Sequence, residues 1–567
     1  MHPKSRGEAA PEIRSAIRPD RRLRGDSCTR TFASARNALS TGMRNRSPIR
    51  SYGREATSNS RLLASVVCVA ILGSLLATSS ALLHWFVIPV TLCGILTAED
   101  ATDWLRARVD LFDPAGLIGL LGVYFFFLTP LLLVSLGQGL DVQYGAPSDW
   151  RPWLGRMAIL NCLGLILYRF VLNLNHAERP PSREIWKLDR VKWMVAVATA
   201  LVVSATLQLW VYRYFGGLGH YLEAVNDPQG RGEAFEGFGS VFLLSESFPL
   251  IAAMGFATYA ARSRYARTWP ALALALSVFL LLELFFGGLR GSRSTTVWAL
   301  FWIVGLIHLR VRPIPRKVLF AGLIGVFLPF MYVYGFYKAR GLDGVAIALS
   351  GTEARARLAE SSGRTWQGVL LGDLGRSDVQ ALVLERIVEA RGDHEYAWGR
   401  TYAAAAALLV PRTVFPQRPD GKVKEGTELI FGRGAYVPSV LASSKVYGLA
   451  GEAMLNFGPV AVPFVFLPLA LLVRAVRRRL TRWRHDARGM MLPMLVGLCL
   501  VMLVSDSDNV VFYLVKTGGL PVLMVLVSKR RVIRWSRQPS VRVGDVGVAG
   551  CRRTAIGAIG VGTSCAS

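Results

Sequence analysis

The sequence lacks the short motifs that identify most nucleotide-dependent and hydrolytic enzymes. It contains no Walker-type phosphate loop, no glycine-rich dinucleotide fingerprint and no serine nucleophile elbow. Its seven histidines are scattered along the chain, and its seven cysteines divide between apolar runs and the terminal segments. No spacing among them is typical of a zinc site or a disulfide framework. We therefore expect neither a bound metal nor a cofactor.

Positive charge is abundant, with 66 Lys and Arg against 38 Asp and Glu in 567 residues. Such an excess often indicates a nucleic-acid partner. Here, however, 52% of the residues are hydrophobic. They gather in runs of about 20 residues, the length that crosses a bilayer as a helix. Because basic loops of multi-pass membrane proteins face the cytoplasm, the composition indicates a membrane protein in contact with lipids, with no nucleic-acid partner.

The apolar runs predict an all-α polytopic integral membrane protein with about 12 transmembrane helices. These helices are expected at 62–78, 80–97, 115–136, 153–172, 191–212, 240–261, 269–289, 294–309, 318–337, 453–473, 490–506 and 510–527. The organisation then has five parts: 1–60, a disordered basic cytoplasmic tail; 61–337, helices one to nine; 338–452, a large, partly helical outer loop; 453–528, helices ten to twelve; and 529–567, a basic, disordered cytoplasmic tail.

The first 60 residues are rich in Arg, Ser and Gly and contain no apolar run. Such a segment cannot bury enough surface to fold alone. It also lacks the short apolar core of a secretory signal. A transit peptide and a translation start near Met43 are two further interpretations, which the sequence does not separate.

The charges of the short connections predict the orientation of the helices. Three connections, 262–267, 310–317 and 474–488, are rich in arginine, as is the segment after residue 528. With twelve crossings all four fall on one side, together with the basic N-terminal tail. The connection at 213–239 falls on the other side and is acidic. This alternation predicts that both termini are cytoplasmic.

Two arginines, Arg290 and Arg293, lie in the stretch FFGGLRGSRS, on the outer side, where short loops usually lack arginine. Gly287, Gly288 and Gly291 flank them and would allow an anionic ligand to approach the backbone closely. Guanidinium groups bind phosphate oxygens in bidentate fashion. Anchoring to lipid headgroups is the alternative; we favour a binding role.

Ionisable residues within spanning helices are costly and usually functional. Five gather in the outer half of the membrane or just beyond it: Glu246, Glu283, Asp506, Asp508 and Lys516. Glu283 precedes Arg290 by two turns, so we expect both on one helix face. Three of them also have a purely structural interpretation: Glu283 as an arginine partner, Lys516 as a chain extending to the surface, and Asp508 as a helix cap. Together they predict a site that opens to the outer face.

The large outer loop has local structure of its own. Ser377 and Gln380 match a capping box, and an apolar stripe follows, which predicts a helix that ends near Gly392. The stretch TYAAAAALLVP at 401–411 is apolar but too short to span the membrane. The proline-rich segment 411–422 then supplies Arg412, Arg418 and Lys422, either as contacts to a phosphate or glycan or as a solvated loop.

Three segments carry distinctive motifs: GGLRGSRS at 287–294, WGRTYAAAAALLVPRTVFPQRP at 398–419 and GLAGEAMLNFGPVAVP at 448–463. Their order resembles the Wzy-type O-antigen polymerases, also described as oligosaccharide repeat-unit polymerases. The resemblance covers roughly residues 62–530, and its specific part is these three motifs. Two departures are mild, because Met454 and Phe415 stand where aromatic residues, Trp in the second case, are common in that family.

The resemblance implies a multi-pass enzyme of the bacterial inner membrane whose large loop is periplasmic. Its substrates would be undecaprenyl-diphosphate-linked oligosaccharides for O-antigen, capsule or exopolysaccharide synthesis, and a chain-length regulator protein is a candidate partner. The growing glycan would move from one lipid diphosphate to a sugar hydroxyl on the next repeat unit. This makes the chain a membrane glycosyltransferase with no cofactor.

That reaction needs cations or donors for the diphosphate leaving group and a base for the attacking hydroxyl. The candidate catalytic residues are Glu452, Asp506 and Asp508. The candidate diphosphate-binding residues are Arg290, Arg293, Arg400, Arg412 and Lys516. The candidate supporting residues are Glu283 and Arg418.

Glu452 follows a glycine and precedes an apolar helix, so we place it at the membrane–water boundary. It would pair with Arg290 or Arg293, or activate the acceptor hydroxyl. The alternative is an acid in a first helical turn, favoured by the helix dipole.

Two other functions remain open. A twelve-helix transporter or flippase of lipid-linked oligosaccharides usually consists of two similar halves. Here the halves show no similarity, and the large loop follows the ninth helix rather than the sixth. An O-antigen ligase, which uses a different acceptor, is harder to distinguish by sequence.

Overall fold

The computed structural model describes the following residues: 54–138, 145, 147–174, 184–226, 234–235, 237–290, 293–353, 355, 368–389, 395–410, 414–437, 441–442, 445–484 and 486–533. The chain divides into two compact units, Met1–Asn59 and Ser60–Ser567. Nearly all described residues belong to the second unit, so most of both predicted tails lies outside the described part.

Within the described residues, eleven helices are long and apolar enough to cross a membrane. Four of them are single helices: Arg151–Asn173 (α6), Arg190–Tyr214 (α7), Trp269–Phe286 (α12) and Asn59–Thr78, which is part of α2 (Arg54–Thr78). Four more precede the large loop and combine consecutive elements: Pro114–Ser135 (α4, Pro114–Val123; η2, Tyr124–Leu128; α5, Thr129–Ser135), Gly239–Ala260 (α10, Gly239–Ser245; α11, Phe248–Ala260), Ser294–Val311 (α13, Arg293–Leu306; η6, Ile307–Val311) and Arg316–Tyr337 (α14, Arg316–Gly322; η7, Leu323–Phe327; α15, Leu328–Leu349). The last three follow the loop: Pro459–Arg482 (η9, Pro459–Ala461; α21, Val462–Arg482), Ala487–Val504 (η10, Ala487–Met491; α22, Leu492–Val504) and Ser507–Ser528 (α23, Ser507–Tyr513; η11, Leu514–Gly519; α24, Leu520–Ser528). The all-α multi-pass architecture is thereby confirmed.

The remaining predicted span, 80–97, is a different element in the structure. A short turn, η1 (Ser80–Leu82), precedes α3, which runs from Val87 to Leu105. The second half of α3 carries Glu99, Asp100 and Asp103, which sets it apart from the eleven apolar helices. The predicted count of twelve therefore stays a prediction.

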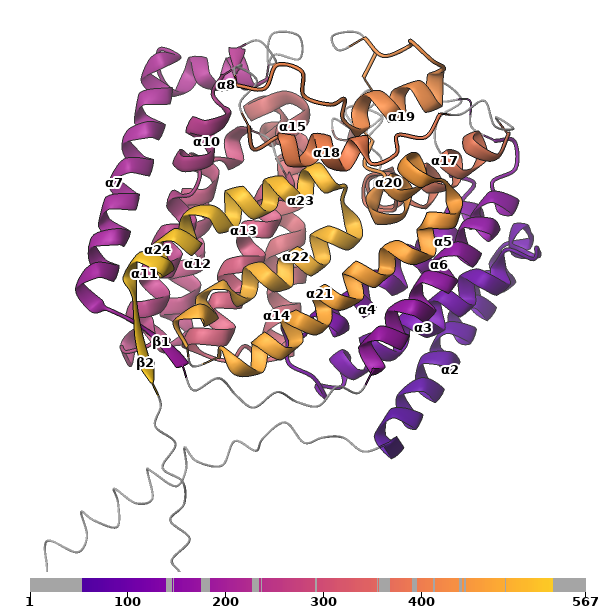
Figure 1. Cartoon of the computed structure of the whole chain (residues 1–567), viewed down its shortest axis with the longest axis horizontal. Helices are drawn as coiled ribbons and strands as arrows, with labels where there is room; N and C mark the ends of the chain where they lie inside the picture. Colours follow the sequence, from indigo (N-terminus) through magenta and orange to yellow (C-terminus); the bar gives the residue numbers. More distant parts are fainter. Residues whose placement is uncertain are drawn as a thin grey trace, which may run out of the picture. The chain divides into compact units, whose positions relative to one another are not determined.

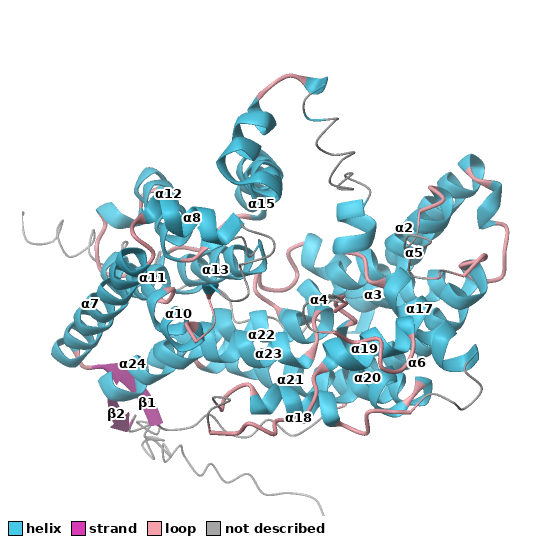
Figure 2. Ribbon diagram, turned by 90° about the horizontal axis from the view of Figure 1, so that it is seen from above, coloured by secondary structure: helices cyan, strands magenta, loops and turns pink. Residues whose placement is uncertain are grey.

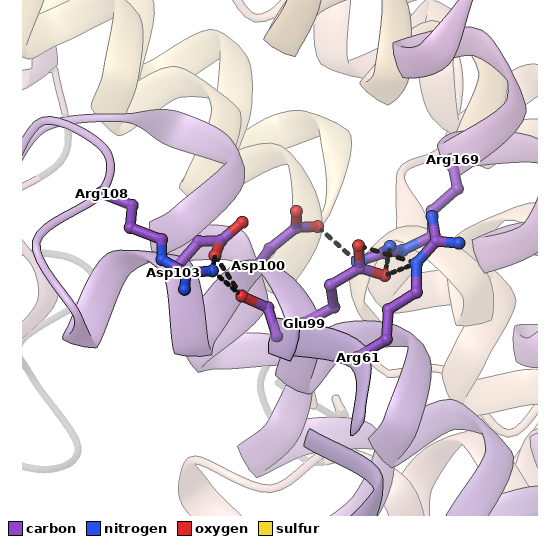
Figure 3. A network of polar contacts seen from close by, with 7 residues as sticks. Arg61, Glu99, Asp100, Asp103, Arg108 and Arg169 are labelled. Carbon is purple, nitrogen blue, oxygen red and sulfur yellow. Dashed lines mark hydrogen bonds and ion pairs between the residues drawn. The ribbon is translucent and has the colours of Figure 1, made fainter. Parts of the chain in front are cut away.

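The acids of α3 are paired with arginines from neighbouring segments (Figure 3). Arg61 on α2 contacts Glu99 at 3.0 Å, and Arg169 on α6 contacts Asp100 at 3.0 Å. Arg169 also pairs with Glu99. Because burying one of these charges alone would be costly, the pairs explain how an acidic helix end packs between α2 and α6.

The basic connections meet at one end of the second unit. A two-stranded antiparallel sheet pairs β1 (Glu184–Leu188) with β2 (Lys529–Ile533), with Glu184 opposite Ile533, and Figure 1 shows it at the lower end. Arg488 donates to the carbonyl of Glu184 at 3.2 Å. Arg316 donates to the carbonyls of Trp104 and Val109, both at 2.7 Å. The predicted same-side placement of these loops agrees with this clustering; that this side is cytoplasmic stays a prediction.

The helices of the large loop lie at the opposite end (Figure 1). They are α17 (Ser377–Glu389), α18 (Arg400–Ala407), α19 (Lys422–Phe431) and α20 (Gly448–Phe457). α20 extends past the predicted loop end at residue 452, and the following span begins at Pro459 rather than at 453. The predicted apolar stripe of α17 is buried in the core, but the predicted capping box is wrong. Ser377 Oγ donates to the carbonyl of Phe125, and Gln380 Nε2 to the carbonyl of Tyr447 at 3.0 Å, because both side chains face packed neighbours.

The main core lies where α21 and α22 pack against α6, α4 and α20. Its fully buried members include Phe466, Val473 and Val496. By contrast, large apolar side chains on α2, α7 and α12 are exposed, for example Leu62, Val202 and Leu281. Exposed apolar surface on that scale marks a membrane or protein interface, and the length of the helices indicates lipid. Figure 2 shows α7 and α2 near opposite margins of the helical array.

Candidate functional site

An open cavity of about 450 Å³ lies between the loop helices and the start of the last spanning helix. Its walls are formed by α18, by α20, by α23, and by the segment that leads into α19 together with the start of α19. The lining residues that bear on chemistry are Thr401, Arg418, Lys422, Glu452, Ser507 and Asp508. The cavity thus unites the proline-rich segment, the GEAMLNFG motif and the Asp506-Ser507-Asp508 corner.

Lys422 connects α19 to the corner at α23. It is the first residue of α19, is buried, and forms ion pairs with Asp506 and, at 3.0 Å, with Asp508. Gly426, one turn later, lies against Tyr447, where an added Cβ would be 1.8 Å from the phenol oxygen. Glycine at this position therefore lets α19 approach α20 closely enough to place Lys422 between the two carboxylates.

Asp506 does not line the cavity, but it contacts two other segments of the chain, the start of α19 through Lys422 and the start of α20 through Gly448. It is fully buried, and its Oδ1 accepts a hydrogen bond from Gly448 N at 2.6 Å. Gly448 has φ +69°, a conformation that glycine adopts without strain. Burial raises the pKa of Asp506, and the opposing charge of Lys422 only partly offsets this. Asp506 is therefore better suited to position Lys422 and α20 than to exchange protons with a substrate.

Glu452 lines the cavity and is the most highly coordinated carboxylate there. Its Oε1 accepts from Ser507 Oγ at 2.5 Å and from Thr401 Oγ1 at 2.8 Å, and its Oε2 accepts from Ser507 N at 2.6 Å. Asn456 Nδ2 donates to Thr401 Oγ1 at 2.7 Å, which orients the threonine. A carboxylate offers about four acceptor positions, so one remains for a substrate hydroxyl.

The electrostatic balance at Glu452 favours a base. Burial raises the pKa of Glu452 above its usual range, while donors from Ser507 and Thr401 act in the opposite direction. A base works best when its pKa is close to the working pH, and the usual carboxylate value is too low for that. The pKa of Lys422 is also raised, because the carboxylates of Asp506 and Asp508 outweigh its burial. Lys422 is therefore a permanent cation in the cavity that Glu452 also lines.

The other predicted residues of this region differ in accessibility. Asp508 lines the cavity and keeps 33% of its side chain exposed, so it remains a second candidate base. Arg418 also lines the cavity. Arg400 begins α18 and pairs with Glu425 at 3.2 Å, and it does not line the cavity. We refer to Lys422, Glu452, Asp506 and Asp508 as the loop cluster.

A second group of charged residues comes from the spanning helices and the turn that follows α12. We call it the Glu246 cluster; its members are Glu246, Glu283, Arg290 and Lys516. Glu246 pairs with Arg290 at 2.7 Å and also with Lys516. Gly287 allows this approach, because a Cβ there would lie 3.2 Å from Glu246 Cδ. Lys516 follows Asp508 by eight residues, so the two clusters are about 12 Å apart along the last helix.

Two details of this region differ from expectation. The predicted helix 269–289 ends at Phe286, and Arg290 lies on a separate turn, Gly288–Arg290. The expected shared helix face of Glu283 and Arg290 is therefore wrong, because Gly287 leaves the helical conformation. Likewise, Glu452 bonds to Ser507 and Thr401, whereas Arg290 pairs with Glu246. Of the alternatives expected for Glu452, the pair with Arg290 is therefore wrong, and the pair with Arg293 involves a side chain outside the described part.

Two predicted site residues lie outside the described part of the chain. These are Arg412 and the side chain of Arg293, whose backbone begins α13. Among the described residues, no group of three His, Cys, Asp or Glu side chains is arranged to hold a metal ion.

Sequence reasoning missed several residues of the site. Thr401, Ser507 and Asn456 received no role, and Lys422 was named as a contact to a phosphate or glycan or as part of a solvated loop, without its carboxylate partners. Asn456 could have been found, because it follows Glu452 by four residues and so shares its helix face. Thr401 and Ser507 are separated from Glu452 by 51 and 55 residues, and no local pattern indicates such contacts.

Comparisons with known proteins returned no match, whether against protein-family models, curated proteins or solved structures.

Proposed function

We propose that this chain polymerises lipid-diphosphate-linked oligosaccharide repeat units at the outer face of the bacterial inner membrane. The observation that carries the proposal is the cavity itself. It combines a hydrogen-bonded carboxylate, Glu452, with the cations Arg418 and Lys422, at the point where the large loop meets the spanning helices. Both requirements of the transfer, a base and a cation, are present within one cavity.

The proposed reaction breaks one bond and forms one. The bond between the anomeric carbon of the growing glycan and its phosphate oxygen breaks, and the lipid diphosphate leaves with the electron pair. A hydroxyl of the incoming repeat unit forms the new glycosidic bond, and its proton passes to Glu452. Arg418 and Lys422 would stabilise charge developing on the leaving diphosphate. No oxidant, reductant or further substrate is required.

The polymerisation must hold two lipid diphosphates at once. The donor diphosphate lies at the reacting bond, and the acceptor diphosphate lies away from it by the length of a repeat unit. The Glu246 cluster, about 12 Å along the last helix from Asp508, offers Arg290 and Lys516 for this second diphosphate. In this proposal the loop cluster carries the chemistry, and the Glu246 cluster holds the acceptor.

A reconstituted assay tests this function and separates it from its alternatives. Purified protein in phospholipid vesicles receives a lipid-diphosphate-linked single repeat unit as the sole substrate. A polymerase lengthens the glycan and releases free lipid diphosphate in equal amount. A flippase moves the substrate across the bilayer unchanged, and a ligase transfers it only when a different acceptor is added. Transport or acceptor-dependent transfer without elongation would overturn the proposal.

The location of the site requires a specific topology. Reporter fusions at Arg312, Arg478 and the C-terminus should report cytoplasm, and fusions at Gly230 and Asp393, which lie outside the described residues, should report the periplasm. A cytoplasmic signal at Asp393 would place the large loop on the wrong side for a periplasmic polymerase.

A further inference from the structure

A second cavity, of about 810 Å³, lies at the basic end of the molecule, far from the loop cluster. It is formed where β1, the start of α7 and the end of α11 meet. These elements lie together at one side in Figure 1, and α7 packs directly against α11. A hydrogen bond from Trp193 Nε1 to Thr258 Oγ1, at 3.1 Å, joins the two helices at the cavity wall.

The cavity has a cationic rim and an apolar wall. The rim carries Lys187, Arg190 and Arg262, all exposed, and no acidic residue lines the cavity. The wall continues along α7 through Met194, Val197, Ala198 and Leu201. From Arg190 to Leu201 the helix advances by about 16 Å, so the cavity follows α7 from the membrane boundary toward the bilayer interior.

The rim charges are not neutralised within the described part of the protein. Nearby acids are already engaged: Glu184 pairs with Arg531, Asp486 pairs with Arg488, and Asp189 caps α7 through Val191 N and Lys192 N. No described carboxylate forms an ion pair with Lys187, Arg190 or Arg262. A fourth lining cation, Arg310, is used internally, because it donates to the carbonyls of Arg484 and Asp486.

We propose that this cavity binds an anionic phospholipid, with the phosphate at the rim and an acyl chain along α7. Charge complementarity selects the headgroup, since basic pockets between spanning helices suit anionic lipid phosphates. The apolar wall selects a lipid over a free phosphate. The C-terminal segment 534–567 is a poor occupant, because it carries five arginines and one aspartate and would be repelled by the rim. The proposal does not depend on the polymerase function.

Native mass spectrometry of the full chain tests this site. The protein, purified in a neutral detergent, is titrated with phosphatidylglycerol and, separately, with phosphatidylcholine. A surface Lys or Arg contributes about fivefold to anionic-lipid binding, so Arg190→Gln with Arg262→Gln should weaken phosphatidylglycerol binding by about 30-fold. The matched control is Arg264→Gln, an exposed arginine of the same loop that does not line the cavity and should have no effect.

A second variant separates the cavity from general surface charge. Ala198→Trp fills the apolar wall while leaving the rim intact, and it should abolish phosphatidylglycerol binding. Wild-type binding by this variant, equal binding of the two lipids, or an equal loss in the Arg264→Gln control would overturn the proposal. Competition by soluble glycerol phosphate as strong as by the lipid would show an anion site only. Stronger lipid binding after removal of residues 534–567, or dimers that exclude lipid, would identify a protein occupant instead.

Discussion

The loop cluster and the Glu246 cluster share one helix but differ in what surrounds them. Both pair carboxylates with cations, which is how charge is retained away from water. The loop cluster opens into a cavity, and its members come from three segments of the chain. In the Glu246 cluster the side chains of Glu246 and Lys516 keep only 3% and 10% of their surface exposed, while Arg290 keeps 23%.

The difference in exposure indicates different roles for the two clusters. A proton-transfer group must reach the substrate, which Glu452 and Asp508 can do from the cavity wall. In the Glu246 cluster only Arg290 combines a cation with substantial exposure. Proton transfer is therefore expected to depend on the loop cluster, and a single conservative substitution in the Glu246 cluster is expected to slow elongation less than one in the loop cluster. Four variants test this contrast, from the largest expected effect to the smallest.

Removing Lys422 should have the largest effect on stability. Lys422→Met leaves the carboxylate of Asp506 buried and uncompensated, a change that costs about 3–5 kcal/mol. The control is Lys424→Met on the same helix, because Lys424 is more exposed and its ion pair, with Asp420 at 2.8 Å, lies at the surface. That exposed pair should contribute about 0–1 kcal/mol. Denaturant unfolding of the purified variants measures both, and equal losses would contradict the structural role of Lys422.

Replacing Glu452 should stop elongation without unfolding the protein. Glu452→Gln keeps the size of the side chain but cannot accept a proton, so elongation should fall by at least about 100-fold. The control is Glu428→Gln on α19, which does not line the cavity. Glu452→Asp, which keeps the charge, should retain more activity than Glu452→Gln. Wild-type chain lengths from Glu452→Gln at equal protein level would remove Glu452 from the mechanism.

Replacing Arg290 should slow elongation less than replacing Glu452, and the effect should depend on the shape of the guanidinium group as well as on its charge. Arg290→Lys preserves a cation beside Glu246 but loses the fork that holds two phosphate oxygens. Loss of one charge-assisted hydrogen bond predicts about a tenfold slower elongation. Alanine at both Arg290 and Arg293 should leave only single repeat units on the lipid carrier. Gel profiles of the glycan measure both, and normal long chains from Arg290→Lys would disprove the role of the fork.

Long uninterrupted helices were the most predictable part of the fold. The expected spans 153–172 and 191–212 correspond to Arg151–Asn173 and Arg190–Tyr214, because their apolar runs are bounded by polar residues. The bounds of the expected span 80–97 differ from the structure, where η1 covers Ser80–Leu82 and α3 covers Val87–Leu105, and the difference has a physical reason. The apolar run is continuous in sequence, but the helix breaks after Thr78. The next helix, α3, continues beyond residue 97 to Leu105 and includes Glu99 and Asp100, whose charges are balanced by arginine partners.

The site was predictable in its residue types and not in its contacts. Glu452, Asp508 and Arg418 were selected from the sequence, and all three line one cavity. The pair of Lys422 with Asp506 joins residues 84 positions apart, which helical periodicity cannot reveal. In the same way, Glu246 meets Lys516 across 270 residues. Such contacts depend on how the helices pack, and packing follows from the whole fold rather than from local patterns.

The smallest effect concerns the pH at which the base works. If Glu452 must be ionised, elongation falls as the pH drops through its pKa, which burial holds above the usual value of 4.5. Thr401→Val removes a donor that stabilises the ionised form, so the pKa of Glu452 rises further and the acid limb of the pH profile moves to higher pH. Thr401→Ser keeps the hydroxyl and should leave the limb in place. Thr295→Val makes the matched change in the Glu246 cluster, where Lys516 Nζ donates to Thr295 Oγ1 at 3.5 Å, and should not move it either. An unshifted limb in Thr401→Val, or an equal shift in Thr295→Val, would show that the base is not Glu452 in the loop cluster.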